Sequence, residues 1–490
     1  MLYVSTRGGE RVTALEAVCR GLSVTGGLFT AENPPEALKL ADLRGLTFQQ
    51  VMARYYHGYI PDLTLGEWES LVEDAFACLA PEGDSAALPL AKLNPYLDRY
   101  YLINTDYFPT GSMADLTAAI LSGLFEWIQR QSGGLQPLVI GLGSWDLALA
   151  FSGSLPGAPK LLLVPDPPLR AGELLGQLKP GQEVRVFSEE LGSRYRELTD
   201  LAGDLAFEAD LRSRGLAPLF LTPGHPAAVL TAGALATASV AQIMETDDEN
   251  ERVDFVVPKG HLSFLAGLVD ASSLGIPVGV AYIGESEPPS LTTLFKSGRI
   301  PLEDKNRRHP GSGAAFPVNL ERLLFEVTGR DEKRTRALME ELTNPQGEPL
   351  RDEEIQLLNQ SIVVAACDYK YGLQLMRTVY DQTDYLFGRD TADALAAWSR
   401  NSRKRDTNPV CFVQLRSPLL DPLASYRAVF GQKDLTGQEA LAVLIEETGV
   451  PAWPGLFETG REEEAAPLPL LQGSIRQTID SFLAACGPEV

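Results

Sequence analysis

Four short apolar runs that alternate with helix-like segments constrain the fold of this chain more than any other sequence feature. The runs are rich in leucine and β-branched residues; they are PLVIGLG at 137–143, KLLLVP at 160–165, EVRVFS at 183–188 and PLFLTP at 218–223. Helix-like segments such as residues 189–200 separate them. This rhythm is typical of a parallel sheet covered by helices, so we predict an α/β fold.

Residues 252–284 repeat the pattern as a compact strand, loop, helix and strand. A glycine-bearing turn between a strand and a helix can hold phosphate with backbone N–H groups, although many such units bind nothing. Further along, residues 330–342, 352–380 and 474–485 have helical patterns, and residues 408–417 form a late core strand.

The stretch at residues 104–129 predicts a helix that begins on a tight loop. Its apolar side chains recur every four residues, at Leu116, Ile120, Leu124 and Ile128. Ser112 is suited to cap the helix start, and Asp115 follows three residues later, close to a capping box. A helix N-terminus on such a loop is a usual place to hold an anion or a cofactor.

Composition limits the classes of partner and the compartment. The chain has 490 residues, enough for two or three domains, and a net charge of −23, which disfavours nucleic acid and anionic membranes. Five widely spaced cysteines indicate reduced thiols in the cytoplasm and no metal site. Charged residues near the start argue against a signal peptide, and we expect no run of about 18 apolar residues that would span a membrane.

Several motifs resemble the threonine synthases, enzymes that use pyridoxal phosphate (PLP). The matching motifs are YVSTRG at 3–8, GGLF at 26–29, Pro109-Thr110 with Asp115, LFEW at 124–127 and NLERLLFE at 319–326. The resemblance covers nearly the whole chain and implies fold type II, with two sheet-containing lobes and a small N-terminal domain. It places that domain at residues 1–80, the two-lobed region at 81–490, and the smaller lobe at about 110–225.

The resemblance also implies that most of the catalytic groups are missing. Ala114 stands where the family has the lysine that forms the Schiff base with PLP, and no lysine lies between Lys92 and Lys160. The threonine that serves the ring nitrogen is matched by Leu415, and the histidine of a late motif by Asp390. An alanine has no amine, so the resemblance implies no covalent cofactor here.

Two loops keep some family residues and supply the candidate site. The substrate loop matches Ser144, Trp145 and Asp146, where tryptophan replaces a glycine. The phosphate loop matches residues 258–263, and the candidates there for binding a ligand or phosphate are Lys259, Gly260, His261 and Ser263. Lys259 is a candidate for phosphate binding or a displaced Schiff base, and a solvated loop lysine is the alternative. For His261 the alternatives are anion binding and simple packing.

Other basic residues allow two interpretations. Arg307, Arg308 and His309 are suited to hold an acidic ligand, and residues 400–405 to meet an acidic partner, but solvated loops explain both.

The function implied is a degenerate threonine synthase homologue, a pseudoenzyme related to amino-acid metabolism. It would bind a small anionic metabolite or a protein partner, such as an active paralogue. The alternative is an active PLP-dependent lyase of threonine biosynthesis, which converts O-phosphohomoserine to threonine and phosphate at an altered site.

Overall fold

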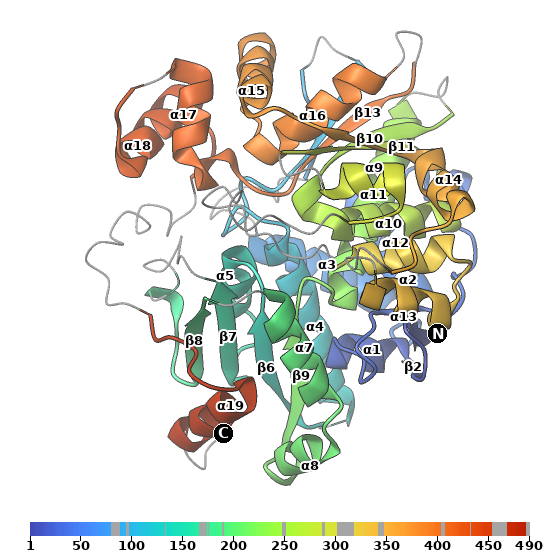
Figure 1. Ribbon diagram of the computed structural model, residues 1–490, viewed down its shortest axis with the longest axis vertical. Helices are drawn as coiled ribbons and strands as arrows, with labels where there is room; N and C mark the ends of the chain where they lie inside the picture. The colour runs from blue at the N-terminus through green and yellow to red at the C-terminus, as the bar shows by residue number, and fades with distance from the viewer. Residues whose placement is uncertain are drawn as a thin grey trace.

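The computed structural model describes residues 1–79, 89–94, 98–132, 134–165, 174, 176–188, 191–246, 251–286, 290–300, 318–341, 347–402, 407–431, 433–452 and 468–486. Its strands form three sheets (Figure 1). A small antiparallel sheet near the N-terminus has the order β2-β1-β3, formed by Arg11–Thr13, Leu2–Ser5 and Phe29–Ala31.

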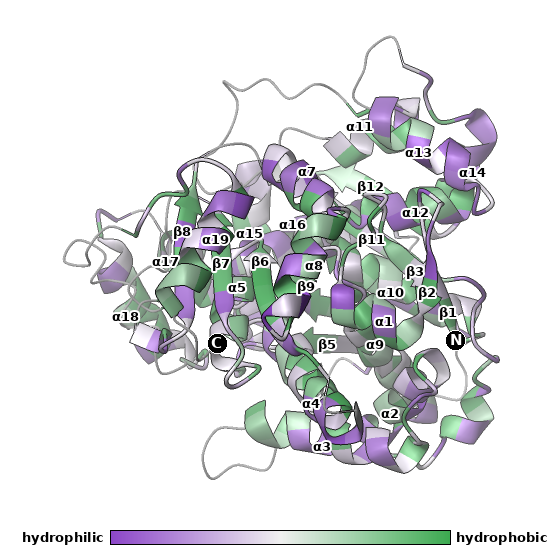
Figure 2. Ribbon diagram, turned by 90° about the horizontal axis from the view of Figure 1, so that it is seen from below, coloured by the Kyte–Doolittle hydropathy of each residue, from purple (hydrophilic) through white to green (hydrophobic). Residues whose placement is uncertain are grey.

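The four-stranded sheet has the order β8-β7-β6-β9 and is parallel throughout. Its strands are Gln182–Phe187, Lys160–Pro165, Gln136–Leu142 and Leu216–Leu221. They coincide with the four apolar runs, so the predicted parallel sheet is confirmed. Leu138, Val139 and Ile140 of β6 are fully buried, as expected for a parallel strand covered on both faces. Figure 2 shows the mostly apolar colouring of these strands.

The six-stranded sheet has the order β12-β11-β10-β13-β5-β4. Its strands are Ile362–Ala366, Val278–Glu285, Val253–Pro258, Val410–Gln414, Tyr100–Asn104 and Leu90–Lys92. The strands run parallel, except that β4 pairs antiparallel with β5. The predicted unit at residues 252–284 is confirmed as β10, helix α10 (Leu262–Ser273) and β11, and the late core strand is β13.

One expectation from the sequence was wrong. Residues 352–380 are not all helical, because β12 separates α14 (Asp352–Ser361) from α15 (Tyr369–Thr383). Three β-branched residues in a row at 362–364 favour a strand once β11 offers a partner, and this long-range pairing outweighs the helical pattern on either side.

Helix α9 (Pro226–Thr246) resembles a membrane span in length and composition. Residues Pro226–Glu245 are long and apolar enough to cross a membrane by length and composition, with a mean hydropathy of 1.6, although no such segment was expected. Within the fold, 89% of the tested window is buried. α9 packs against α10 and against α2 (Phe48–Tyr59), so its apolar character on all sides is that of a core helix.

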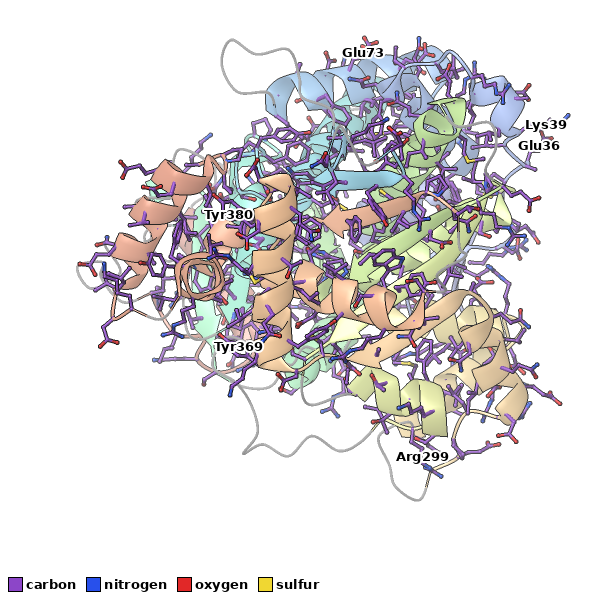
Figure 3. All side chains as sticks on the ribbon, turned by 90° about the horizontal axis from the view of Figure 1, so that it is seen from above. Glu36, Lys39, Glu73, Arg299, Tyr369 and Tyr380 are labelled. Carbon is purple, nitrogen blue, oxygen red and sulfur yellow. The ribbon has the colours of Figure 1, made fainter. Side chains whose placement is uncertain are left out.

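The remaining helices complete the two lobes. They are α1 (Ala14–Arg20), α3 (Leu65–Leu79), α4 (Ala114–Ser132), α5 (Trp145–Gly153), α7 (Leu191–Ala202), α8 (Leu205–Ser213), α11 (Ser290–Ser297), α12 (Leu320–Val327), α13 (Glu332–Glu341), α16 (Arg389–Asn401), α17 (Pro422–Phe430), α18 (Gly437–Thr448) and α19 (Ile475–Cys486). Helix α16 packs on β11, and α15 contacts both α16 and α17. Figure 3 shows Tyr369 and Tyr380 toward opposite ends of α15.

Buried polar contacts tie the N-terminal segment to α12. The Arg7 guanidinium donates to both carboxylate oxygens of Glu321 at 2.9 and 2.8 Å, and the Thr6 hydroxyl donates to Glu321 at 2.6 Å. The next residue, Arg322, donates to the carbonyl oxygens of Phe29 and Gly224, each at 2.8 Å. The family-like run at 319–326 therefore serves the assembly of the fold.

The predicted domain boundary at residue 80 stays a prediction. That residue lies outside the described part of the chain, and one hydrophobic cluster includes Phe48 and Trp68 as well as Leu235 of α9.

Candidate functional site

The helix predicted within residues 104–129 is α4, and Ala114 is its first residue. The Ser112 hydroxyl accepts a hydrogen bond from the Ala114 N–H at 3.2 Å, so Ser112 caps the helix as predicted. The Asp115 carboxylate accepts hydrogen bonds from the N–H and the hydroxyl of Thr110, at 3.0 and 2.9 Å, which fixes the loop before the helix. The loop therefore presents Ala114, which carries no functional group, at the helix start.

The segment that follows β13 lies against this loop. Ser112 and Arg416 form an isolated antiparallel bridge, and the Ser417 N–H donates to the Gly111 carbonyl at 3.0 Å. Leu415 is fully buried, and the side chain of Arg416 is 40% exposed. The parallel order of β13 and β5 explains this placement, because both strands end at the same edge of the sheet.

An ion pair joins the two lobes at this edge. The Nε atom of Arg416 donates to Oδ2 of Asp146 at 3.0 Å, and the side chain of Asp146 is 9% exposed. Asp146 belongs to the first turn of α5, at one end of the four-stranded sheet (Figure 1). The charge of Asp146 raises the pKa of Arg416, so this guanidinium is a permanent cation between the lobes.

His261 and Asp390 complete what we call the junction cluster, which consists of Asp146, His261, Asp390 and Arg416. Burial lowers the pKa of His261 to about 4, while the charges of Asp390 and Asp146 act in the opposite direction. The imidazole is therefore neutral at pH 7. A Cβ atom added to Gly260 would lie 3.8 Å from Oδ2 of Asp390, so this exposed carboxylate lies beside the phosphate-loop backbone.

Lys259 points to a different partner. Its ammonium lies 2.8 Å from Oε2 of Glu285 and donates to the Ser290 hydroxyl at 3.0 Å. The fully buried Glu285 carboxylate also accepts the backbone N–H groups of Leu291 and Thr292 at the start of α11. The lysine therefore neutralises a buried carboxylate, and an anion would have to compete with Glu285 for it.

The other predicted residues lie nearby with varied exposure. Gly260 is in the short 3-10 helix Lys259–His261, which has one turn. Ser263 is half-buried in the first turn of α10. The exposed Ser144 caps α5 through its hydroxyl, which accepts from the Leu147 N–H at 3.4 Å. Trp145 is buried and donates to the Pro165 carbonyl at 3.1 Å, so this substituted residue packs within its own lobe.

The remaining basic candidates are only partly described. Arg307, Arg308 and His309 lie outside the described residues, as do residues 403–406. Arg400 donates to the Ala366 carbonyl at 3.0 Å and lies over the Tyr371 ring. Among the residues that the structure describes, no group of three or more His, Cys, Asp or Glu side chains could hold a metal ion.

Arg416 and Asp390 are not among the binding residues predicted from the sequence. One signal was available: both are charged side chains in segments where the resemblance implies other residue types. Their mutual placement depends on β10, β13 and α16 meeting at one sheet edge, which no local pattern reveals.

Two parallel sheets whose strand ends meet at a junction between lobes are the architecture of PLP-dependent enzymes of fold type II. The PLP-bound threonine synthase of Brucella melitensis matches with a TM-score of 0.74 at 17% identity, over 99% of this chain and 100% of that one. The yeast threonine synthase matches with a TM-score of 0.78 at 18% identity, over 99% of each chain. The fold class predicted from the sequence is therefore confirmed.

Sequence comparisons lead to the same enzymes. The family model "Threonine synthase N terminus" matches residues 2–76. The threonine synthase of Methylobacillus glycogenes is 22% identical over 416 residues, which cover 81% of this chain and 85% of that protein. The chain thus resembles threonine synthases in sequence and has their fold.

The residues at the junction do not fit PLP held as a Schiff base in the manner that the resemblance implies. Ala114 offers no amine, and Leu415 offers no polar group to a ring nitrogen. The Asp390 carboxylate lies beside Gly260, where a phosphate group would be repelled. Lys259 is engaged by Glu285 at 2.8 Å.

A buried carboxylate lies behind the junction. Asp106 is 1% exposed, and its Oδ2 accepts hydrogen bonds from the Tyr385 hydroxyl and the Gln414 amide, each at 2.8 Å. Its Oδ1 has no hydrogen-bond partner among the described residues. Burial raises the pKa of Asp106 to about 7, against the lowering effect of these two donors.

We expect Asp106→Asn to flatten the dependence of stability on pH. An unfolded aspartate ionises near pH 4, so between about pH 4 and 7 the folded protein binds the extra proton and loses stability as the pH rises. Three pKa units correspond to at most about 4 kcal/mol. Urea unfolding at several pH values measures this slope.

The matched comparison is Asp270→Asn, because burial also raises the pKa of Asp270 to about 7. Each single variant should reduce the slope of unfolding free energy against pH, and the double variant should reduce it further. Superimposable pH profiles for the wild type and Asp106→Asn would show that Asp106 does not titrate in this range.

Proposed function

We propose that this protein is a threonine synthase homologue without Schiff-base chemistry, which binds a small carboxylate-bearing metabolite at the junction of its two lobes. The metabolite would belong to amino-acid metabolism, the area in which its relatives are named. The junction cluster is the binding site in this proposal.

One observation carries the proposal. Where the resemblance places a reactive lysine, the chain has Ala114, and the backbone of Arg416, whose side chain is 40% exposed, is bridged to Ser112 two residues before it. A fixed cation in place of an amine supports binding without covalent chemistry.

Two other functions remain as alternatives to be tested. A working PLP lyase would need a relocated amine, and Lys259 is the candidate in the phosphate loop. A scaffold that binds an active paralogue or another protein would need no ligand. The engagement of Lys259 by Glu285 favours neither covalent use nor free anion binding by this lysine.

We expect the purified chain to form no imine with PLP. After incubation with PLP and reduction with borohydride, peptide mass spectrometry should find no pyridoxyl adduct on Lys259 or on the peptide that contains Ala114, because alanine has no amine and the Lys259 ammonium is paired with Glu285. A threonine synthase treated in parallel is the positive control. A stoichiometric adduct on Lys259, abolished by Lys259→Ala, would establish the lyase alternative.

The Ala114→Lys variant separates two reasons for a negative result. An adduct at residue 114 in this variant would mean that the site lacks only the amine, whereas its absence would mean that Asp390 and Leu415 also exclude the cofactor.

Ligand binding itself is tested by thermal shift with inorganic phosphate, PLP, O-phosphohomoserine and the standard amino acids. A ligand present at ten times its Kd adds about 1.4 kcal/mol of stability, which raises Tm by about 1–3 °C for a chain of this size. If no compound stabilises the wild type, metabolite binding is refuted and the protein-partner alternative takes its place.

A further inference from the structure

Arg416 is held in a fixed position with its terminal nitrogens available. Its backbone is bridged to Ser112, and its Nε is engaged by Asp146 at 3.0 Å. The two terminal nitrogens of the guanidinium have no hydrogen-bond partner among the described residues, and 40% of the side chain is exposed. An arginine fixed through Nε presents its outer N–H groups to a ligand, and a planar carboxylate matches them.

The start of helix α16 lies directly beside Arg416. The Gly388 N–H donates to Oε1 of Gln414 at 2.7 Å, and a Cβ atom on Gly388 would lie 3.4 Å from the Arg416 carbonyl oxygen. Asp390 follows two residues later in the first turn of α16. The exposed Asp390 carboxylate acts electrostatically on the Arg416 guanidinium, and the structure shows no ion pair between the two groups.

Asp390 is also held on a rigid support. Its neighbour Arg389 donates to Oδ1 of Asp393 at 2.9 Å and lies 4.4 Å from the centre of the Tyr369 ring. The first turn of α16 is therefore fixed to α15, and the Asp390 carboxylate keeps its place at the junction.

The charges around Arg416 select among ligands. The charges of Asp146, Asp390 and Asp421 all act on its guanidinium, and among these described residues only Asp146 forms an ion pair with it. These carboxylates repel any anion placed at Arg416, and they repel a phosphate dianion more strongly than a singly charged carboxylate. A molecule with a carboxylate and an ammonium group can place the first on Arg416 and the second at Asp390.

We propose that Arg416 and Asp390 form a binding site for a zwitterionic ligand, a free α-amino acid, with its carboxylate on the guanidinium and its ammonium group at the Asp390 carboxylate. This inference rests on the proposed function and specifies its ligand class. Asp146 is a positioning residue in this site, because it orients Arg416 through Nε. Neutral His261 adds no charge to the site at pH 7.

The test is calorimetric titration of the full chain with four probes. They are the amino acid that binds best among the standard twenty, its analogue without the amine, its analogue without the carboxylate, and inorganic phosphate. The intact amino acid should bind at least about ten-fold more tightly than either analogue or phosphate, since each analogue loses one charge-assisted contact.

Two variants test the roles of the two residues. Asp390→Asn should lower the affinity for the amino acid about ten-fold, because it removes the attraction to the ammonium group. It should raise the affinity for the analogue without the amine, because it removes the repulsion of the carboxylate. Arg416→Met should lower the affinity for both of these ligands. Asp381→Asn changes an exposed carboxylate in α15 that pairs with Arg377, and it should leave every affinity unchanged. Circular dichroism checks that each variant is folded.

The outcomes separate this inference from the proposed function. If a plain carboxylate binds in an Arg416-dependent way while no amino acid binds more tightly, the proposed function stands and the zwitterion site is refuted. Equal affinities for the wild type and Asp390→Asn would also refute it. If no probe binds, both fail.

Discussion

Arg322→Met is expected to destabilise the protein by about 3–5 kcal/mol. The buried guanidinium of Arg322 donates to the Phe29 carbonyl, to the Gly224 carbonyl and to the side chain of Asn319. Methionine fills a similar volume but leaves these buried acceptors without a donor. The charge of Arg322 also lowers the pKa of Asp270, so its loss would make ionised Asp270 harder to bury.

The matched control for this change is Arg336→Met in α13. Arg336 is exposed and, among the described residues, donates only to the Arg7 carbonyl, so its loss should lower the free energy of unfolding by at most about 1 kcal/mol. Urea unfolding of both variants beside the wild type measures the difference. Equal midpoints for the two variants would show that the Arg322 contacts contribute little to the fold.

Gly284→Ala is expected to lower the free energy of unfolding by about 3 kcal/mol or to prevent folding. A Cβ atom on Gly284 would lie 1.7 Å from the carbonyl oxygen of Asp393, which belongs to the backbone of α16. Rotation of a side chain cannot relieve this clash, so α16 would have to move away from β11. Because Asp390 lies in the first turn of α16, the same movement would disturb the junction cluster.

Gly66→Ala in α3 is the control for the glycine change. No atom lies within 4 Å of a Cβ atom placed there, so alanine should be neutral or stabilise by about 0.5–1 kcal/mol through its better helix propensity. Thermal and urea unfolding of both variants measure the contrast. A Gly284→Ala variant with wild-type midpoints would mean that α16 packs less closely on β11 than the structure indicates.

Local patterns in the sequence were sufficient for most of the fold. The runs that became β6, β7, β8 and β9 are apolar over their whole length, because a parallel strand covered on both faces needs no polar side. The four-residue spacing of Leu116, Ile120 and Leu124 likewise predicted α4, and all three side chains are buried. Strand β12 was not predicted, because it forms a strand only through pairing with β11, which is distant in the sequence.

The candidate site was only partly predictable. Asp146, Lys259 and His261 were named from the two loops that match the family, and they do lie at the strand ends. The direction in which each side chain points did not follow from the sequence. Lys259 forms an ion pair with Glu285, and Asp146 forms one with Arg416, which is 270 residues away in the chain.

The sequence by itself determined that the chain has the elements of a two-lobed α/β fold and that residue 114 carries no amine. These facts depend on residue identity and local periodicity, which the order of amino acids states directly. Only the tertiary structure decided which charges meet. Arg416, Asp390 and Asp146 come from three separate segments, and the sheet edges and the packing of α16 bring them together. An electrostatic site depends on distances of a few ångströms between such segments, and those distances exist only once the sheets have formed.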